Sequence, residues 1–414
     1  MNVVAVIILV TLAANWALDL AAGILNVRNL RSELPAGFED VYDPDRYRRS
    51  QAYLRANTRL GWVSGTVTLA ALLAFWFGGG FSRVDVWVRS FGWGTVPTGL
   101  AFVAVLVMIR FLLGLPFSIY AVFVIEERFG FNRTGWKTFA ADRVKAGLLG
   151  AAVGGPLLAG ILIFFERAAG DAWWICWIAV TLFSLALQYV APAYIMPLFN
   201  KFTPLEDGPL KTAILDYTRA VDYPVANLAV MDGSKRSGKG NAFFAGFGRH
   251  KRIALFDTLI RQHTVEELVA VLAHEIGHYK KRHVLQGMLI GIGHAGVMFY
   301  LLSRFISYPG LFEAFYMSEV SVYGGMIFFA MLFSPVDFFL GLLLQMRSRR
   351  NEFAADRFAA ETTGRPEAMI SALKKLSANN LGNLLPHPFH VFLHYSHPPV
   401  TVRVAALKGL PPGV

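Results

Sequence analysis

Seven long apolar segments constrain the fold of this chain more than any other feature of its sequence. Most of them exceed the roughly 20 residues that a helix needs to cross the hydrocarbon core of a bilayer. The composition agrees, since 55% of the 414 residues are hydrophobic, 16% are charged and the mean hydropathy is +0.46. Buried helices of soluble proteins rarely run this long without charge on one face. We therefore predict a mainly α, polytopic membrane protein with about seven spans, at residues 3–25, 60–81, 96–125, 146–165, 172–198, 284–305 and 323–346.

Basic residues in the short loops predict the orientation of these spans. The loop after the first segment holds seven arginines, and the loop between the third and fourth holds five lysines and arginines. The alternate loops hold far fewer, namely Arg83 and Arg89, then Arg167, then Arg304 at the end of the sixth segment. This bias places the N-terminus outside and puts the polar stretches 200–283 and 347–414 on the cytoplasmic side.

The chemistry is carried by the run His-Glu-Ile-Gly-His at 274–278, within a stretch that otherwise predicts a strong helix over 264–280. Residues four apart lie on one helix face, so His274 and His278 can bind one cation. Glu275 stays beside them, where it can take a proton from a zinc-bound water molecule. This H-E-x-x-H pattern predicts a catalytic site with one Zn²⁺ per chain. The alternative is a helix with two surface histidines and an ion-paired glutamate.

A catalytic zinc ion needs a third protein ligand. A metzincin would place glycine at 281 and histidine at 284, where this chain has Lys281 and Val284. Glu352 and Asp356, four residues apart beyond the seventh segment, fit instead. Glu352 could complete the ligand set, and Asp356 could fix the tautomer of a ligand histidine. The alternative is an ordinary surface pair that balances neighbouring arginines. The sixth and seventh segments form an antiparallel hairpin, which returns the chain to the side it left.

Two further stretches could serve catalysis and substrate binding. The transition state needs a hydrogen-bond donor at the oxyanion, for which His397 and Arg403 are candidates, although a loop histidine is more often structural. Residues 241–247 and 252–256 predict a β-hairpin, after a helix over 209–221 and a strand over 227–231. The first hairpin strand could be an edge strand that a substrate peptide extends, through Asn241, Ala242 and Phe243. A core hairpin fits the pattern equally well. Residues 202–208 predict a loop, and 347–414 predict mainly helix with a proline- and histidine-rich loop at 385–399.

Several classes of function are disfavoured. The net charge of +11 is better explained by cytoplasmic flanks beside anionic membrane lipid than by nucleic acid. The stretch 233–240 nearly spells a phosphate-binding loop, but Gly240 stands where Ser or Thr would hold magnesium, so we expect no nucleotide. Cys176 is the single cysteine, which excludes an internal disulfide and a thiolate-rich zinc cluster. Polar residues inside the spans should face protein or a water-filled space: Asn15, Asp19, Arg110, Gln188, His294 and Asp337.

In combination, these features resemble the type I CAAX prenyl proteases, which are membrane-embedded zinc metalloproteases. The resemblance covers most of the chain and rests on runs at 131–133, 197–204, 233–237, 241–244, 251–259, 274–278, 348–356 and 395–399. It implies seven helices around a hydrated chamber, capped on the cytoplasmic side by a gluzincin-like zinc domain with a small β-sheet. It also implies peptide or protein substrates, with prenylated or membrane-associated proteins among them. The family removes the last three residues of prenylated C-terminal CAAX peptides.

The resemblance also implies a role for each candidate residue. His274, His278 and Glu352 would be zinc ligands, and Glu275 would be the general base. The remaining candidates would support the ligands or contact substrate: Asp356 behind the ligands, His397 and Arg403 near the oxyanion, and Asn241 on the substrate-binding edge strand. Shorter quality-control proteases of the HtpX type share the zinc motif but have fewer spans.

Other readings belong to different functional classes. A zinc-binding transporter would explain polar groups in the spans, but a cargo site has no need of Glu275. A catalytically silent peptide-binding scaffold is a further alternative. We predict four chain sections: helices one to five over 1–199, the first part of the zinc domain over 200–283, helices six and seven over 284–346, and its second part over 347–414. The chain resembles bacterial members, so we expect a bacterial inner membrane.

Overall fold

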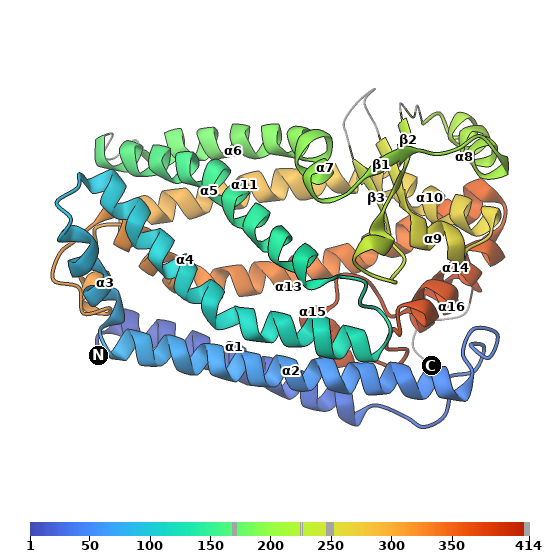
Figure 1. Ribbon diagram of the computed structural model, residues 1–414, viewed down its shortest axis with the longest axis horizontal. Helices are drawn as coiled ribbons and strands as arrows, with labels where there is room; N and C mark the ends of the chain where they lie inside the picture. Colours follow the sequence, from blue (N-terminus) through green and yellow to red (C-terminus); the bar gives the residue numbers. More distant parts are fainter. Residues whose placement is uncertain (168–171, 224, 226, 246–251, 410–414) are drawn as a thin grey trace.

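Seven long helices dominate the structure, and the prediction of seven apolar spans is confirmed. The structure is a computed structural model that describes residues 1–414 except 168–171, 224, 226, 246–251 and 410–414, and except the side chains of 242–245 and 252. Figure 1 shows the long helices running together along the molecule, with the sheet and most of the short helices at one end. Among the described residues, these helices are long and apolar enough to cross a membrane: α1 (Val3–Arg28), α2 (Pro44–Phe77), α4 (Thr95–Tyr120), α5 (Trp136–Arg167), α6 (Ala172–Val190), α11 (His283–Phe305) and α13 (Val322–Thr363).

The second helix differs from its prediction at both ends. α2 begins at Pro44, well before residue 60, because Asp43 caps it by accepting a hydrogen bond from the Arg46 N–H at 2.7 Å. It ends at Phe77, because Gly79 adopts a left-handed conformation with φ 71° and a new helix, α3 (Gly80–Arg89), follows. The apolar span is therefore only the second half of a longer helix.

The end of the molecule farthest from the sheet has a packed aromatic core. The ring of Phe315 stacks on Phe328 at 4.0 Å and on Trp76 at 4.8 Å. Buried Asp85 accepts a hydrogen bond from the Tyr323 hydroxyl at 2.5 Å, which joins α3 to the start of α13. This core holds the helices together at one end, next to the short helix α12 (Pro309–Glu313).

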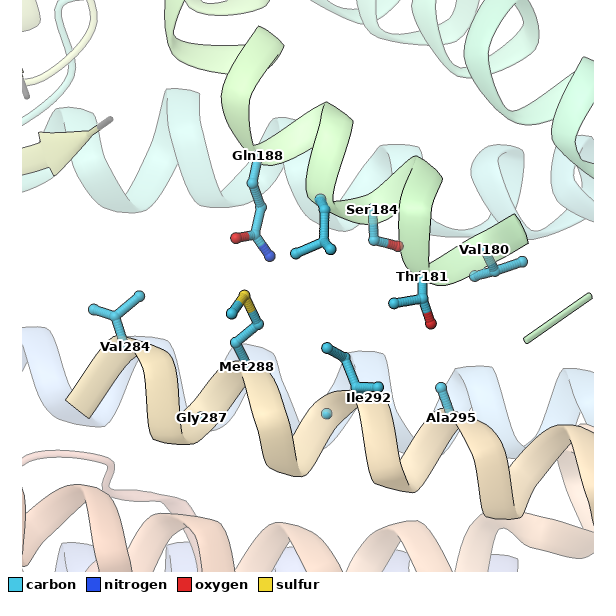
Figure 2. A pocket seen from close by; sticks show the side chains of 11 residues that line it. Val180, Thr181, Ser184, Gln188, Val284, Gly287, Met288, Ile292 and Ala295 are labelled. Carbon is cyan, nitrogen blue, oxygen red and sulfur yellow. The ribbon is translucent and has the colours of Figure 1, made fainter. Parts of the chain in front are cut away.

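Nearer the sheet, α6 and α11 separate around a cavity of ≈ 400 Å³. Figure 2 shows Gln188 of α6 and Met288 of α11 pointing toward one another across it, with Ser184 on the same wall as Gln188. On the other side of α11, His294 Nε2 lies 2.9 Å from Asp337 Oδ1 of α13. Of the polar residues predicted to face protein or water, Gln188 lines a cavity and His294 and Asp337 meet each other, whereas Arg110 is exposed.

The polar end contains a four-stranded sheet in the order β1-β2-β4-β3. β1 pairs antiparallel with β2, β2 pairs parallel with β4, and β3 pairs antiparallel with β4. β3 is therefore an outer strand of the sheet, which is one of the two alternatives that the sequence left open. The elements that build this end are β1 (Phe202–Pro204), α8 (Pro209–Ala220), β2 (Asn227–Met231), β3 (Ala242–Ala245), β4 (Arg252–Phe256), α9 (Asp257–Gln262) and α10 (Val265–Lys280).

The hairpin of β3 and β4 is confirmed, and so are the strand at 227–231 and the helix after residue 209. The predicted strand 241–247 is shorter, and its last two residues lie outside the described part of the chain. The loop predicted at 202–208 is wrong in its first half. Its first three residues form β1 because they pair with β2, with Phe202 opposite Met231 and Pro204 opposite Ala229. These partners are too far along the chain for the local pattern to reveal them.

The last section is helical, as predicted, and α13 runs through residue 347 without a break. It is followed by α14 (Pro366–Asn379), α15 (Pro388–His394) and α16 (Val400–Leu407). The loop predicted at 385–399 is wrong in its centre, where α15 forms. His387 caps α15 by accepting from the Phe389 N–H at 3.2 Å, and Pro388 occupies the first helical position, which tolerates proline.

Candidate metal centre and active site

The helix that carries the H-E-x-x-H run is anchored at its start. Thr264 is the N-cap of α10, and it exchanges two hydrogen bonds with Glu267, at 3.0 and 3.3 Å, in a capping box. Buried Glu267 also accepts from Ser371 at 2.6 Å and pairs with Lys375 at 2.7 Å, both on α14. These contacts fix how far the helix is rotated and therefore which way its histidines point.

His274, His278 and Glu352 come together as a possible metal site, with ligand atoms that all lie within 4.8 Å of one another. The two Nε2 atoms of His274 and His278 are 3.1 Å apart. Two nitrogens at about 2.0 to 2.1 Å from a tetrahedral zinc ion would be roughly 3.3 Å apart. Glu352 Oε2 lies 3.4 Å from His274, and Oε1 lies 3.3 Å from His278. The sequence prediction that a second helix returns Glu352 to the motif is therefore matched in space.

The chemistry of this donor set fits a cation. Glu352 is buried, and its Oε2 atom accepts no hydrogen bond from the described residues. A buried carboxylate oxygen without a hydrogen-bond donor is costly, and the positive charge beside Oε2 is that of Arg403, whose Nη1 atom lies 3.3 Å away without forming a hydrogen bond. His274 and His278 present nitrogens that bind a divalent ion when unprotonated. A metal ion would satisfy all three groups at once.

Asp356 holds His274 from behind, as predicted from the sequence. His274 Nδ1 lies 2.8 Å from Asp356 Oδ1, so a proton on Nδ1 leaves the Nε2 lone pair directed at the other ligands. Burial by itself lowers the pKa of His274, but its contacts with Asp356 and Glu352 outweigh burial and raise that pKa to about 9. The metal-free site therefore binds a proton tightly where it would bind a metal.

Arg403 lies among these acidic groups. Its guanidinium makes a two-pronged contact with Asp356, at 2.7 and 2.6 Å, and its Nη1 atom is 3.3 Å from Glu352 Oε2. The side chain is only 10% exposed. The structure thus brings Arg403 to the site but engages its donors with carboxylates, which bears on the role predicted for it at an oxyanion.

His283 completes the surroundings of the metal centre, and the sequence analysis did not assign it a role. Its Nδ1 lies 3.0 Å from the Nδ1 of His278. When Nε2 of His278 faces a metal, its Nδ1 must carry the proton and donate to His283. Arg282, with φ 58°, turns the chain between α10 and α11 and brings His283 back to the site. The sequence signal was present, since His283 lies one position before the metzincin ligand position.

Glu275 and His397 are the two remaining candidates beside the centre, and they differ in exposure. Glu275 is adjacent to His274 on α10, and burial raises the pKa of its carboxyl group above the ordinary value. His397 Nε2 lies 3.3 Å from Glu352 Oε1, and the side chain is 62% exposed. Its loop is held by Arg349 of α13, which donates to the Tyr395 carbonyl at 2.6 Å. Arg349 is a second residue that the sequence analysis did not single out.

The predicted substrate-binding residues lie at the start of the outer strand. Asn241 immediately precedes β3 and is exposed, and Ala242 and Phe243 are its first residues. The side chains of Ala242 and Phe243 lie outside the described residues. Among the described strands, β3 pairs with β4 alone and lies at the outside of the sheet, the position at which an added strand can pair.

Comparisons with known proteins agree with this geometry. The family model described as CAAX prenyl protease N-terminal, five membrane helices, matches residues 24–201, and that of Peptidase family M48 matches residues 204–410. CAAX prenyl protease 1 of Saccharomyces cerevisiae is 31% identical, over 91% of this chain and 88% of its own. The CAAX prenyl protease 1 homolog of Mus musculus is 32% identical, over 95% and 92%. The crystal structure of S. mikatae Ste24p has 30% identity and a TM-score of 0.93, over 99% of this chain and 100% of that one.

Proposed function

We propose the metal, the site residues and the substrates of this chain, which belongs to peptidase family M48. It is a multi-pass membrane metallopeptidase of the CAAX prenyl protease type. The metal is one zinc ion held by His274, His278 and Glu352. The observation that carries this assignment is the convergence of the two Nε2 atoms and the buried Glu352 carboxylate. Zinc suits a site of two imidazoles and one carboxylate that leaves a position open.

Bound zinc supplies an acidified water molecule and polarises the scissile carbonyl. Glu275 accepts the proton of the attacking water and later delivers it to the leaving amine. The raised pKa of Glu275 favours the first step, because a more basic carboxylate accepts a proton more readily. His397, exposed and close to Glu352, donates a hydrogen bond to the oxyanion.

Asp356 and Arg403 act on the ligands and not on the substrate. Asp356 fixes His274 in the tautomer that binds metal, and Arg403 holds Asp356 in place through two hydrogen bonds. The positive charge of Arg403 also offsets the negative charges of Glu352 and Asp356. We therefore assign Arg403 as a positioning residue.

The substrate is proposed to be the C-terminal peptide of a prenylated protein, from which the last three residues are removed. The similarity to CAAX prenyl protease 1 of Saccharomyces cerevisiae and to its mouse homolog supports this assignment. The peptide would extend the outer edge of β3 beside Asn241, Ala242 and Phe243. The cavity between α6 and α11 supports a hydrated chamber among the spans that admits substrate. We place the protein in a bacterial inner membrane, where its spans contact lipid. The N-terminus lies outside, and the zinc site lies on the cytoplasmic side.

The test compares wild type, Glu275→Gln and Glu266→Gln for zinc content and for cleavage of a farnesylated C-terminal peptide. Glu266 is an exposed residue in the first turn of the same helix, so its variant is a matched control. Glu275→Gln should keep one zinc ion per chain and lose about 10²- to 10⁴-fold in kcat, the range of a general base. Unchanged cleavage in Glu275→Gln would refute the assigned mechanism.

A further inference from the structure

The side-chain amide of Asn380 forms two hydrogen bonds with the backbone of Gly240. Gly240 lies two positions before the first residue of β3. The Gly240 N–H donates to Asn380 Oδ1 at 3.2 Å, and the Gly240 carbonyl accepts from Asn380 Nδ2 at 3.3 Å. In an antiparallel sheet, two residues on neighbouring strands exchange the same pair of hydrogen bonds. The Asn380 amide therefore takes the place that a residue of an added strand would occupy.

These hydrogen bonds lie on the outer edge of the sheet. The next carbonyl along the chain, that of Asn241, points the other way and accepts from the Phe256 N–H of β4 at 3.2 Å. Successive residues of an extended chain direct their N–H and C=O groups to opposite edges. Gly240 therefore faces away from β4, and the same alternation turns the backbone of Ala242 and Phe244 outward.

Asn380 is held firmly in this position. It follows the last residue of α14, and its backbone N–H donates to the Leu376 carbonyl at 3.1 Å. The next residue, Leu381, has φ 50° and a buried side chain, so the chain turns sharply there. α14 is in turn joined to the start of α10 through the contacts of Glu267. The amide is thus a rigid part of the scaffold that carries the metal ligands.

We propose that Asn380 is the end-stop of the substrate-binding edge and limits how far a substrate extends beyond the cleaved bond. This inference rests on the proposed function, in which a peptide adds to β3. An added strand can pair with Phe244 and Ala242, but the next outward position, Gly240, is already bonded. In the antiparallel arrangement, which is the more stable per residue, the C-terminal part of the substrate lies toward Gly240. The site therefore selects peptide bonds close to a substrate's C-terminus.

The test uses the full-length, zinc-loaded protein and peptides that wild type cleaves. One series is lengthened by one to four residues at the C-terminus, and a second series is lengthened at the N-terminus. Mass spectrometry identifies the bond that is cut, and the measured quantity is the ratio of kcat/KM between lengthened and parent peptides. This ratio does not depend on the fraction of active enzyme. Asn379→Ala is the matched control, because Asn379 bonds Arg46 and Gln262 instead of the strand.

Lengthening the C-terminus should lower kcat/KM of wild type and Asn379→Ala by roughly tenfold, the scale of losing two ordinary hydrogen bonds at the edge. In Asn380→Ala this penalty should fall to about threefold or less, because Gly240 becomes available for pairing. Asn380→Ser, which also frees that edge, should behave the same way. N-terminal lengthening should have no such dependence on residue 380.

Three outcomes would overturn the inference. If Asn380→Ala keeps the wild-type penalty, Asn380 is not an end-stop, while the proposed protease function stands. If residue 380 instead controls the effect of N-terminal lengthening, the assigned direction of the substrate is wrong. If wild type cleaves no peptide, the proposed function fails and this inference fails with it.

Discussion

Asp356 orients His274 and raises its pKa, although it is not itself one of the proposed metal ligands. Its carboxylate accepts from His274 Nδ1 at 2.8 Å and from two nitrogens of Arg403. One negative charge thus orients a ligand histidine and neutralises a buried guanidinium. Because the pKa of His274 is about 9 without metal, the site is protonated at neutral pH. A metal ion must therefore displace a proton, since it needs the same Nε2 lone pair.

We predict that zinc binding at pH 7 releases about one proton from His274, and that the affinity rises about tenfold per pH unit until pH 9. In the metal-free protein, protonated His274 stabilises the fold fully below its unfolded pKa, and this contribution is lost as the pH rises through about 9. Calorimetric titration in buffers of different ionisation enthalpy measures the released protons. Asp356→Asn should release fewer at pH 7, and equal release in both proteins would contradict the prediction.

At the scale of elements, the site depends on how closely α10 crosses α13. Gly277 lies between the two ligand histidines, and a Cβ atom there would be 3.1 Å from Ala355 Cα and 3.2 Å from the Phe358 ring. The neighbour is partly helix backbone, which cannot move away as a side chain can. The absence of a side chain at Gly277 therefore lets His274 and His278 reach Glu352 on the other helix.

Gly277→Val should push α10 away from α13, lower zinc affinity more than tenfold and destabilise the protein by about 1 to 3 kcal/mol through overpacking. Gly277→Ala should cause a smaller loss of stability and of zinc affinity, because about 1 kcal/mol of helix propensity partly offsets the contact of its Cβ atom with Ala355. Gly147→Val on α5 is the control, since nothing described lies within 4 Å of a Cβ there. Thermal unfolding and zinc analysis measure both effects. Equal zinc affinity in Gly277→Val and wild type would show that the close crossing is not required.

At the scale of the whole molecule, α13 links the membrane part to the metal. It begins in the aromatic core at the far end, passes His294 of α11 at Asp337, and delivers Glu352 and Asp356 near its other end. Helix α11 starts at His283, beside His278. The hairpin of α11 and α13 therefore places both halves of the site on the same side of the bilayer.

We predict that this side is the cytoplasm. In a Cys176→Ser background, which has no other cysteine, Ser90→Cys should react with a membrane-impermeant thiol reagent in intact cells. Asp207→Cys should react only after the membrane is opened. Both positions are exposed, so accessibility through the membrane alone decides the outcome. Labelling of Asp207→Cys in intact cells, with protection of Ser90→Cys, would reverse the orientation.

Four features could be predicted from the sequence alone: the seven spans, the motif helix, the β3–β4 hairpin and the candidate ligands. These features follow from local physics, because hydropathy, helical spacing and end-capping act over a few neighbouring residues. The H-E-x-x-H run needs only one helix turn to place two histidines on one face. Even Glu352 could be anticipated, since a hairpin of two spans must return the chain to the side it left.

Contacts between residues that are distant in sequence became known from the tertiary structure. β1 forms against β2, Arg403 pairs with Asp356, His283 supports His278, and Asn380 bonds a glycine 140 positions before it. No local pattern specifies these partners, because helix crossings such as that at Gly277 set the distances between them. The contact of Arg403 with Asp356 is likewise set by packing, and not by its residue type.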